Sequence, residues 1–550
     1  MKTTKNIARL AVTAGLTAAL SFGGVMATVT MAFAAEGAAP SYSLTINKSV
    51  DNDSTSFKAY QIFKADVIDG KSGKVASNIE WPSDDAETAV LKVLVDNNVP
   101  GITLDSTASD VADYLSKITD TTSLPQSSIL NKIALAVEKS VTATGDSFAA
   151  GRAFTTTSAG YYLFMTDTDS LSANEKQTGT SPIFAVVGGN AVVVTEKTSI
   201  PTVTKQVKDD GADNDWKYKA DSQMGQTVQY KLTGTVASNV DTFNTYYYEF
   251  HDELSAGLTV DKSTVKAVIG ETQITPTSVT MSDPDSNGRT VLSVKFDDLK
   301  AAATAAGVTV GEHTRVVVTY SAKLDPNKSQ HVVVGGTGNS NTVKLIYSNN
   351  PGHDSRGESV PDTVRDYTYA LKLVKKDATD ENKILKGVKF TIRATDPDDI
   401  ASKDMYVQEN GSLGTEAYEF TTTDSGEINV KGLDAGTYTV KETHTLAGYN
   451  TIPEFTFTIK VIGFNQAEGE GENKITVETS TRGSNLVEVD TTNTDNGTAA
   501  LIVKNKQGSG LPLTGLNGVT FTWIAGGAVL CIGVAHLIRS RKQAEESEQE

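Results

Sequence analysis

Cysteine is nearly absent from this chain of 550 residues. The one cysteine, Cys531, lies in an apolar stretch close to the C-terminus, so no second thiol exists with which it could form a disulfide inside the chain. Exported proteins often use disulfides as cross-links. If this chain is exported and cross-linked, the cross-link must use other chemistry.

Basic residues are outnumbered. Lys and Arg total 49 against 67 Asp and Glu, which gives a formal net charge of −18. Nucleic-acid binding depends on clustered Lys and Arg at the phosphates, so this balance argues against nucleic acid as a partner. An acidic surface of this kind mostly favours solubility.

Histidine is scarce as well, with six residues scattered along the chain. His251-Asp252 has no second His-rich segment at ligand spacing and predicts no metal site. Asp283 to Gly288 is similar to the start of an EF-hand loop, but Val294 occupies the twelfth position instead of Glu, so a hairpin turn is expected. The chain has no Gly-rich phosphate loop of useful specificity and no nucleophile elbow. We therefore expect no metal, no cofactor and no enzyme activity.

The N-terminus has the order of a secretory signal. Three basic residues within the first nine precede an apolar run from Leu10 to Phe33, and Ala32-Phe33-Ala34 matches an A-x-A cleavage site. Such a segment is removed on export and takes no part in the fold. We predict a signal peptide over residues 1–34.

The C-terminus carries a motif, an apolar span, a basic stop and an acidic tail. The span from Leu516 to Ile538 is long enough to cross a bilayer as a helix, which takes roughly 20 residues. Arg539, Arg541 and Lys542 favour the cytoplasmic side. The motif before the span is Leu511, Pro512, Leu513, Thr514 and Gly515.

This order over residues 511–550 resembles the sorting signal of sortase substrates in Gram-positive bacteria. In that family a cysteine transpeptidase cuts between the Thr and the Gly and joins the Thr carbonyl to an amine. The resemblance implies a cut between Thr514 and Gly515, a sortase as partner, and a secreted protein anchored in the cell wall through peptidoglycan. The cut would discard the transmembrane segment together with Cys531. The alternative is an ordinary C-terminal membrane anchor.

The length between the two signals suggests three domains. Residues 41–198 combine strand-like alternation with helical periodicity and predict an α+β domain. Its strands are expected over Tyr42–Ile46, Gly160–Phe164 and Ile183–Val194, and its helices over 86–95, 108–118 and 129–137.

The other two regions are rich in short alternating strands. Residues 200–364 contain one short Ala-rich helix near Leu299, and residues 365–508 have strands separated by turns, which is typical of a β-sandwich. The sequence therefore predicts a mainly β protein with tandem immunoglobulin-like sandwich domains after the α+β domain.

The third region has a Lys in its first strand, an acid on a middle strand and an Asn in its last strand. Tyr438-x-x-x-Glu442-Thr443 followed by Gly448-Tyr449 resembles the E-box of collagen-adhesin B-type domains of Gram-positive surface proteins. In that family the first-strand Lys forms an isopeptide bond with the last-strand Asn, assisted by the Glu. The resemblance implies Lys375, Asn505 and Glu442, with Lys375 favoured by its Lys-x-Asp match. Lys372 and Lys376 are the rival donors.

The second region repeats the arrangement. It opens with Pro201–Val207, has Phe250–Leu254 midway and closes with Asn339–Pro351. These segments resemble the middle domain of sortase-assembled major pilins. The resemblance implies a second cross-link between Lys205 and Asn341, assisted by Asp252. Lys208 and Asn339 are the nearest alternatives. In the first region, Asn47-Lys48 and Asn190 form a weaker pair for which no acidic partner is identifiable.

This chemistry has a physical basis. A neutral Lys amine must attack the Asn carboxamide carbon and release ammonia, and burial disfavours the charged forms of Lys and of a carboxylate alike. A neutral carboxylic acid can then polarise the amide, while fixed proximity replaces a bimolecular encounter. The bond would close a long loop as a disulfide does.

A polymerising subunit also needs an amine that receives the next Thr. In the major pilins this Lys lies in a Tyr-Pro-Lys-Asn-like motif at the end of the first domain, where Lys197 takes the Lys place although Thr195, Glu196 and Thr198 depart from the motif. The alternative is an ordinary solvated linker residue.

The sequence is therefore interpreted as a shaft subunit of a sortase-assembled surface pilus. Its partners would be sortase, other copies joined from Thr514 to Lys197, minor pilins and peptidoglycan. The alternative is a monomeric wall-anchored adhesin or a minor pilin, and a wall-anchored hydrolase is disfavoured because no catalytic constellation is present.

Overall fold

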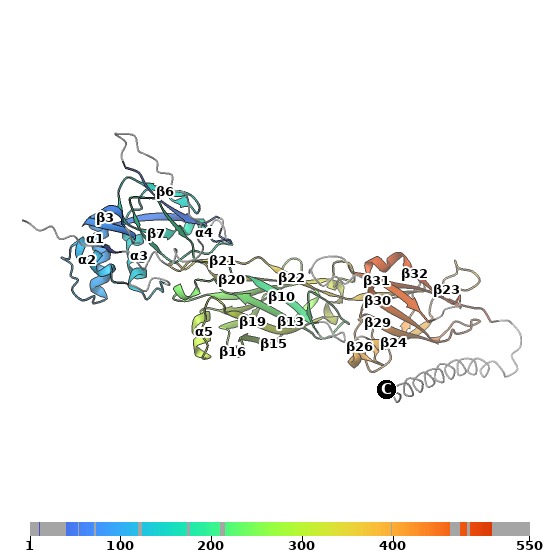
Figure 1. Ribbon diagram of the computed structural model, residues 1–550. Coiled ribbons are helices and arrows are strands. Elements are labelled where there is room, and N and C mark those ends of the chain that lie inside the picture. The colour runs from blue at the N-terminus through green and yellow to red at the C-terminus, as the bar shows by residue number, and fades with distance from the viewer. Residues whose placement is uncertain are drawn as a thin grey trace, which may run out of the picture.

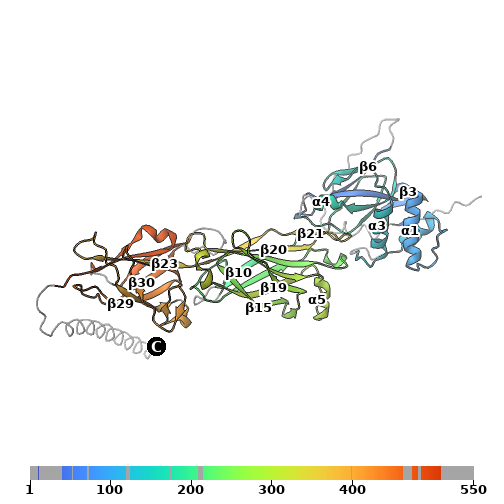
Figure 2. The ribbon, with the colours of Figure 1, turned by 180° about the vertical axis from the view of Figure 1, so that it is seen from behind.

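Three β-rich domains follow one another along an elongated molecule (Figure 1). This computed structural model describes residues 10–11, 40–52, 54–70, 73–118, 124–172, 176–208, 215–397, 399–462, 473–480 and 485–508. The mainly β architecture with helices concentrated in the N-terminal domain is confirmed, and the view from behind in Figure 2 shows the same row of domains.

Both predicted end signals fall largely outside the described residues. Of the predicted signal peptide only Leu10–Ala11 is described, and the predicted sorting signal at 511–550 is not described at all. In the part of the chain that the structure describes, no helix is both long and apolar enough to cross a membrane.

The N-terminal domain has three layers. Its elements are β1 (Leu10–Ala11), β2 (Tyr42–Asn47), β3 (Ser56–Gly70), β4 (Gly73–Glu80), α1 (Asp84–Asp96), α2 (Ala108–Leu115), α3 (Ile129–Ser140), β5 (Phe148–Ala149), β6 (Ala153–Thr156), β7 (Gly160–Thr166), α4 (Thr168–Ser172), β8 (Ile183–Val187) and β9 (Val192–Thr195). One apolar core joins α1, α2 and α3 to a six-stranded sheet of order β1-β4-β3-β7-β8, in which β5 pairs with β3. A second core joins the other face of this sheet to the three-stranded sheet β6-β2-β9.

The three predicted helices are confirmed, and each begins at a side-chain cap. Ser83, Thr107 and Ser128 accept backbone N–H groups from the first turns of α1, α2 and α3. The expectation of continuous strand from Ile183 to Val194 is wrong. Gly188 and Gly189, with φ of +149° and +61°, turn the chain between β8 and β9, which belong to different sheets.

The middle domain packs two sheets around one core. Its elements are β10 (Val203–Lys208), β11 (Trp216–Lys217), β12 (Lys219–Asp221), β13 (Val228–Thr235), η2 (Val240–Thr242), β14 (Tyr248–Leu254), β15 (Leu258–Ile269), β16 (Thr272–Ile274), β17 (Ser278–Met281), β18 (Thr290–Phe296), α5 (Leu299–Ala305), β19 (Arg315–Leu324), η3 (Pro326–His331), β20 (Asn339–Ser348), β21 (Arg356–Glu358) and β22 (Asp362–Tyr367). The sheet orders are β11-β10-β13-β19-β15-β16 and β12-β22-β20-β14-β18-β17, with β21 beside β20.

The segment that is similar to an EF-hand start forms the predicted hairpin turn. It joins the antiparallel strands β17 and β18, and Asp285 Oδ1 accepts the N–H groups of Asn287 and Arg289, each at 2.8 Å. Nowhere in the described ranges do three or more His, Cys, Asp or Glu side chains gather so that they could hold a metal ion.

The C-terminal domain is a second sandwich. Its elements are β23 (Tyr369–Asp377), β24 (Lys389–Pro397), η4 (Ile400–Ser402), β25 (Tyr406–Val407), β26 (Leu413–Gly414), β27 (Phe420–Thr421), β28 (Glu427–Leu433), β29 (Gly436–His444), β30 (Phe455–Ile462), β31 (Lys474–Thr479), β32 (Val487–Asp490), η5 (Thr491–Asn496) and β33 (Thr498–Asn505). The sheet β28-β23-β33-β32 packs through one core on the sheet β26-β25-β24-β29-β30-β31, in which β27 pairs with β24.

Candidate cross-linking sites

The middle domain brings Lys205, Asp252 and Asn341 together in its core. Lys205 lies on β10 in one sheet, while Asp252 on β14 and Asn341 on β20 lie in the other. Each occupies an inward position of a strand whose side chains alternate between core and surface, because successive side chains of a strand point to opposite faces. All three side chains are fully buried, so three polar groups meet inside an apolar sandwich.

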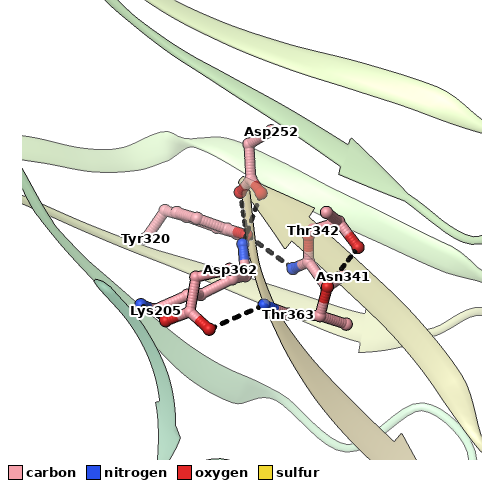
Figure 3. Close-up of polar contacts among 7 residues, drawn as sticks. All are labelled: Lys205, Asp252, Tyr320, Asn341, Thr342, Asp362 and Thr363. Carbon is pink, nitrogen blue, oxygen red and sulfur yellow. Dashed lines mark hydrogen bonds and ion pairs between the residues drawn. The ribbon is translucent and has the colours of Figure 1, made fainter. Parts of the chain in front are cut away.

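A tyrosine connects the three residues (Figure 3). The Lys205 ammonium donates to Asp252 Oδ1 and lies 3.1 Å from Tyr320 Oη. The Tyr320 hydroxyl donates to Asp252 Oδ2 at 2.5 Å and accepts from Asn341 Nδ2 at 2.7 Å. Within the described part of the chain, Asn341 Oδ1 has no hydrogen-bond partner although it is buried.

Burial makes the Lys205 amine unusually easy to deprotonate. Loss of solvation lowers the pKa of Lys205 to about 8, and Asp252 offsets only part of that shift. The ring centroids of Tyr230 and Tyr320 each lie 5.5 Å from Lys205 Nζ, so the amine is surrounded by aromatic faces. A neutral amine, the form that attacks an amide carbon, is therefore accessible near neutral pH.

The C-terminal domain assembles a second cluster from a different topology. Lys375 on β23 and Asn505 on β33 belong to neighbouring parallel strands of one sheet, in which Asp377 is paired with Asn505. Glu442 projects from β29 of the opposite sheet. The side chains of Lys375 and Glu442 are fully buried, and so is Asn505.

In this cluster the three side chains contact one another directly. Lys375 Nζ donates to Asn505 Oδ1 and, at 3.1 Å, to Glu442 Oε2. Asn505 Nδ2 donates to Glu442 Oε1 and to Thr445 Oγ1, each at 2.7 Å. Burial lowers the pKa of Lys375 to about 8, against the opposing effect of Glu442. The carboxyl group thus contacts both the amine and the amide nitrogen.

The rival residues lie elsewhere. Lys372 and Lys376 are partly exposed on the face of β23 opposite to Lys375, and Lys372 forms an ion pair with Glu427 at 2.9 Å. The Nζ atom of Lys208 lies 5.8 Å from the ring centroid of Trp216. Asn339 is buried, but its side chain hydrogen-bonds the backbone of Val333 and Asp366 instead of reaching Lys205.

Two members of these clusters were not expected from the sequence. Tyr320 follows Val316 and Val318 on the core face of β19, where an apolar side chain is the ordinary interpretation. Thr445 lies in the loop after β29. The one signal for Tyr320 is its position in the inward series of β19, and that pattern fits a core tyrosine equally well.

The N-terminal domain does not bring its weaker pair together. Strand β2 runs parallel to β9 with Leu44 opposite Val192 and Asn47 opposite Thr195. Lys48 and Asn190 therefore lie beyond opposite ends of this pairing, and both are exposed.

Lys197 lies between two anchored neighbours. Burial raises the pKa of Glu196, whose carboxylate accepts from Thr55 Oγ1 at 2.5 Å and from the Ser49 N–H at 3.0 Å. Thr198 is also buried and donates to Asn239 Oδ1 at 3.0 Å. The Lys197 side chain is exposed between them.

Comparison with known proteins places the fold. Residues 370–479 match the family described as SpaA: Prealbumin-like fold domain. The T6 backbone pilin of Streptococcus pyogenes, whose structure is described as modular with three domains, aligns with a TM-score of 0.50 at 14% identity, over 85% of this chain and 99% of that chain. The chain has the fold of a backbone pilin.

Other major pilins align over similar lengths. SpaD of Corynebacterium diphtheriae has a TM-score of 0.45 at 16% identity, over 87% of this chain and all of that one, and SpaA of the same organism has 0.42 at 13%, over 85% and 100%. No curated protein sequence matches the chain.

Proposed function

We propose that this protein is the shaft subunit of a covalent surface pilus, polymerised by a sortase and stabilised by two Lys–Asn isopeptide bonds. One observation carries the proposal. In each of two tandem domains, a buried Lys with a lowered pKa contacts a buried acid, and an Asn carboxamide belongs to the same cluster. Burying a charged side chain is costly, so two such clusters in one chain are better explained by chemistry than by stability.

The proposed bond forms by exchange of one amide for another. In the C-terminal domain, Lys375 Nζ attacks Asn505 Cγ, the Cγ–Nδ2 bond breaks and ammonia leaves. Glu442 contacts both nitrogens, so it can return to Nδ2 the proton that Nζ loses. In the middle domain Lys205 and Asn341 react in the same way with Asp252 as the acid.

The polymer would form when sortase joins Thr514 of one copy to Lys197 of the next. An exposed amine on a segment held by Glu196 and Thr198 supports Lys197 as the acceptor, because a fixed backbone presents it in one place. The base of the polymer would be joined to peptidoglycan, with minor pilins as further partners. The proposed domains are residues 41–198, 200–364 and 365–508, between the signal peptide and the sorting signal.

Intact-mass measurement of the purified mature chain tests the bonds. We expect a deficit of two ammonia molecules, one for each cluster. A mass that equals the sequence mass would refute both bonds.

A gel of cell-wall extracts tests the polymer. Lys197→Ala should abolish the ladder of subunit multiples, whereas Lys92→Ala, on an exposed lysine of α1, should leave it unchanged. A ladder that persists in Lys197→Ala would remove Lys197 from this role, and a single band from the unaltered chain would favour a monomeric adhesin.

A further inference from the structure

The two candidate clusters differ in how the acid reaches the amide. Glu442 Oε1 lies 2.7 Å from Asn505 Nδ2, a direct contact. Asp252 has a side chain shorter by one methylene, and both of its oxygens are engaged by Lys205 and Tyr320. The group that contacts Asn341 Nδ2 is the Tyr320 hydroxyl.

We propose that Tyr320 is a catalytic residue of the middle-domain cross-link, where its hydroxyl relays a proton between Asp252 and the leaving nitrogen of Asn341. The inference rests on the proposed isopeptide chemistry and deepens it. The hydroxyl is 3.1 Å from Lys205 Nζ and 2.7 Å from Asn341 Nδ2, so it contacts both reacting groups.

The relay balances. The Lys205 ammonium first passes one proton to Asp252, with which it is hydrogen-bonded, so that a neutral amine and a carboxylic acid result. Lys205 Nζ then attacks Asn341 Cγ. Tyr320 gives its proton to Nδ2 and takes one from the carboxylic acid form of Asp252, and the Cγ–Nδ2 bond breaks to release ammonia. Asp252 then takes the surplus proton from Lys205 nitrogen, so that acid and hydroxyl end as they were before the attack.

The surroundings hold the hydroxyl in place. The ring of Tyr320 stacks on that of Tyr230 with centroids 5.3 Å apart and an angle of 12° between the ring planes. Burial, followed by the nearby Asp252, raises the pKa of Tyr320 well above its ordinary value. The hydroxyl therefore stays protonated in the resting site and can act as a donor, as a proton relay requires.

The test compares two tyrosines of one stack in the full mature chain. Cells are induced briefly and sampled over time, and digestion with mass spectrometry follows the Lys205–Asn341 and Lys375–Asn505 cross-linked peptides in each sample. Tyr320→Phe should slow the middle-domain bond by about 100-fold or more, as general acid–base catalysis contributes. The C-terminal bond forms in the same chain and serves as the internal reference, so its rate should not change.

The matched control is Tyr230→Phe. It keeps the ring that stacks on Tyr320 and lies beside Lys205, and it removes only a buried hydroxyl that has no hydrogen-bond partner within the described residues, so both bonds should form at the unaltered rate. An unaltered middle-domain rate in Tyr320→Phe would overturn the proposal.

A folding defect is separated by chains that cannot form the bond. Asn341→Ala with and without Tyr320→Phe should melt within a few degrees of each other, and a large drop would make Tyr320 a structural residue and overturn the proposal. If the unaltered chain never forms the Lys205–Asn341 peptide, the proposed function fails instead, because no reaction exists to relay.

Discussion

The middle and C-terminal domains place similar chemical groups on different strand topologies. In the middle domain the Lys and the Asn come from opposite sheets, so a bond between Lys205 and Asn341 would tie the two sheets across the core. In the C-terminal domain, Lys375 and Asn505 come from neighbouring parallel strands, so their bond would stop β23 and β33 from sliding past each other. What the clusters share is a buried amine beside a buried acid.

This difference separates two requirements. The amine and the acid need burial, which both sandwiches supply through inward strand positions. The distance between acid and amide depends on which strands carry them. In the C-terminal domain Glu442 contacts the amide directly, whereas in the middle domain Tyr320 connects Asp252 to the amide. The proposed reaction therefore does not depend on one particular sheet arrangement.

Removing the acids should give the largest effect. Glu442→Gln should abolish the C-terminal bond and leave the middle one, so that the mass deficit falls from two ammonia molecules to one, and Asp252→Asn should do the converse. The altered domain should lose roughly 5 kcal/mol from the missing link and about 3–5 kcal/mol more from a buried Lys without its carboxylate. Intact-mass measurement gives the ammonia deficit, and urea unfolding of the full chain gives the loss in unfolding free energy.

The outcome is specific to each domain. If Glu442→Gln removed both ammonia deficits, the clusters would not be independent, and if it removed neither, the acid would have no part in the reaction.

Removing the Asn amide should lower the unfolding free energy less than removing the acid, and by the same amount in the two domains. Asn505 lies 130 positions after Lys375, and the loop from Lys205 to Asn341 is of similar length, so loop entropy predicts a loss of roughly 5 kcal/mol for either Asn→Ala. The measurement is the urea midpoint of each domain's transition. A loss confined to one domain would show that native contacts, and not loop closure, decide the stabilisation.

The bond-free variants should also reveal a pH dependence. In Asn341→Ala the Lys205 amine remains, with its folded pKa lowered to about 8 from 10.5. The unfolded chain then binds more protons between these values, so the free energy of unfolding should rise with pH from about 8 to 10.5, by about 3 kcal/mol in all. Asn505→Ala should behave alike, because burial lowers the pKa of Lys375 to about 8 as well.

The bonded chain supplies the control, because an amide nitrogen does not titrate in this range. The quantity to compare is the difference in unfolding free energy between variant and unaltered chain at each pH. A difference independent of pH would mean that the lysine amine is not buried in the variant.

Much of the fold followed from patterning. The helical periodicity at 86–95, 108–118 and 129–137 and the strand alternation of the later regions correspond to observed elements, because each buries one face. The split between β8 and β9 was missed, since the chain reads as apolar on both sides of Gly188-Gly189.

The candidate sites were less readable from sequence. A Lys, an acid and an Asn far apart in the chain were expected to meet, and they lie together in both clusters. Tyr320 could not be found, because an inward tyrosine among valines predicts only core packing, and its role depends on how far Asp252 reaches across to another sheet.

The rival lysines should give the smallest effect. Because Lys372 and Lys376 lie on the other face of β23, replacing either with Ala should leave both ammonia deficits intact. Lys375→Ala should remove one deficit. The ion pair of Lys372 with Glu427 is partly exposed, and such pairs contribute about 1 kcal/mol or less, so stability should barely change. Intact-mass measurement with peptide mapping separates the three variants. If an ammonia deficit were lost in Lys372→Ala or Lys376→Ala but kept in Lys375→Ala, the cross-link would lie on the other face of the strand.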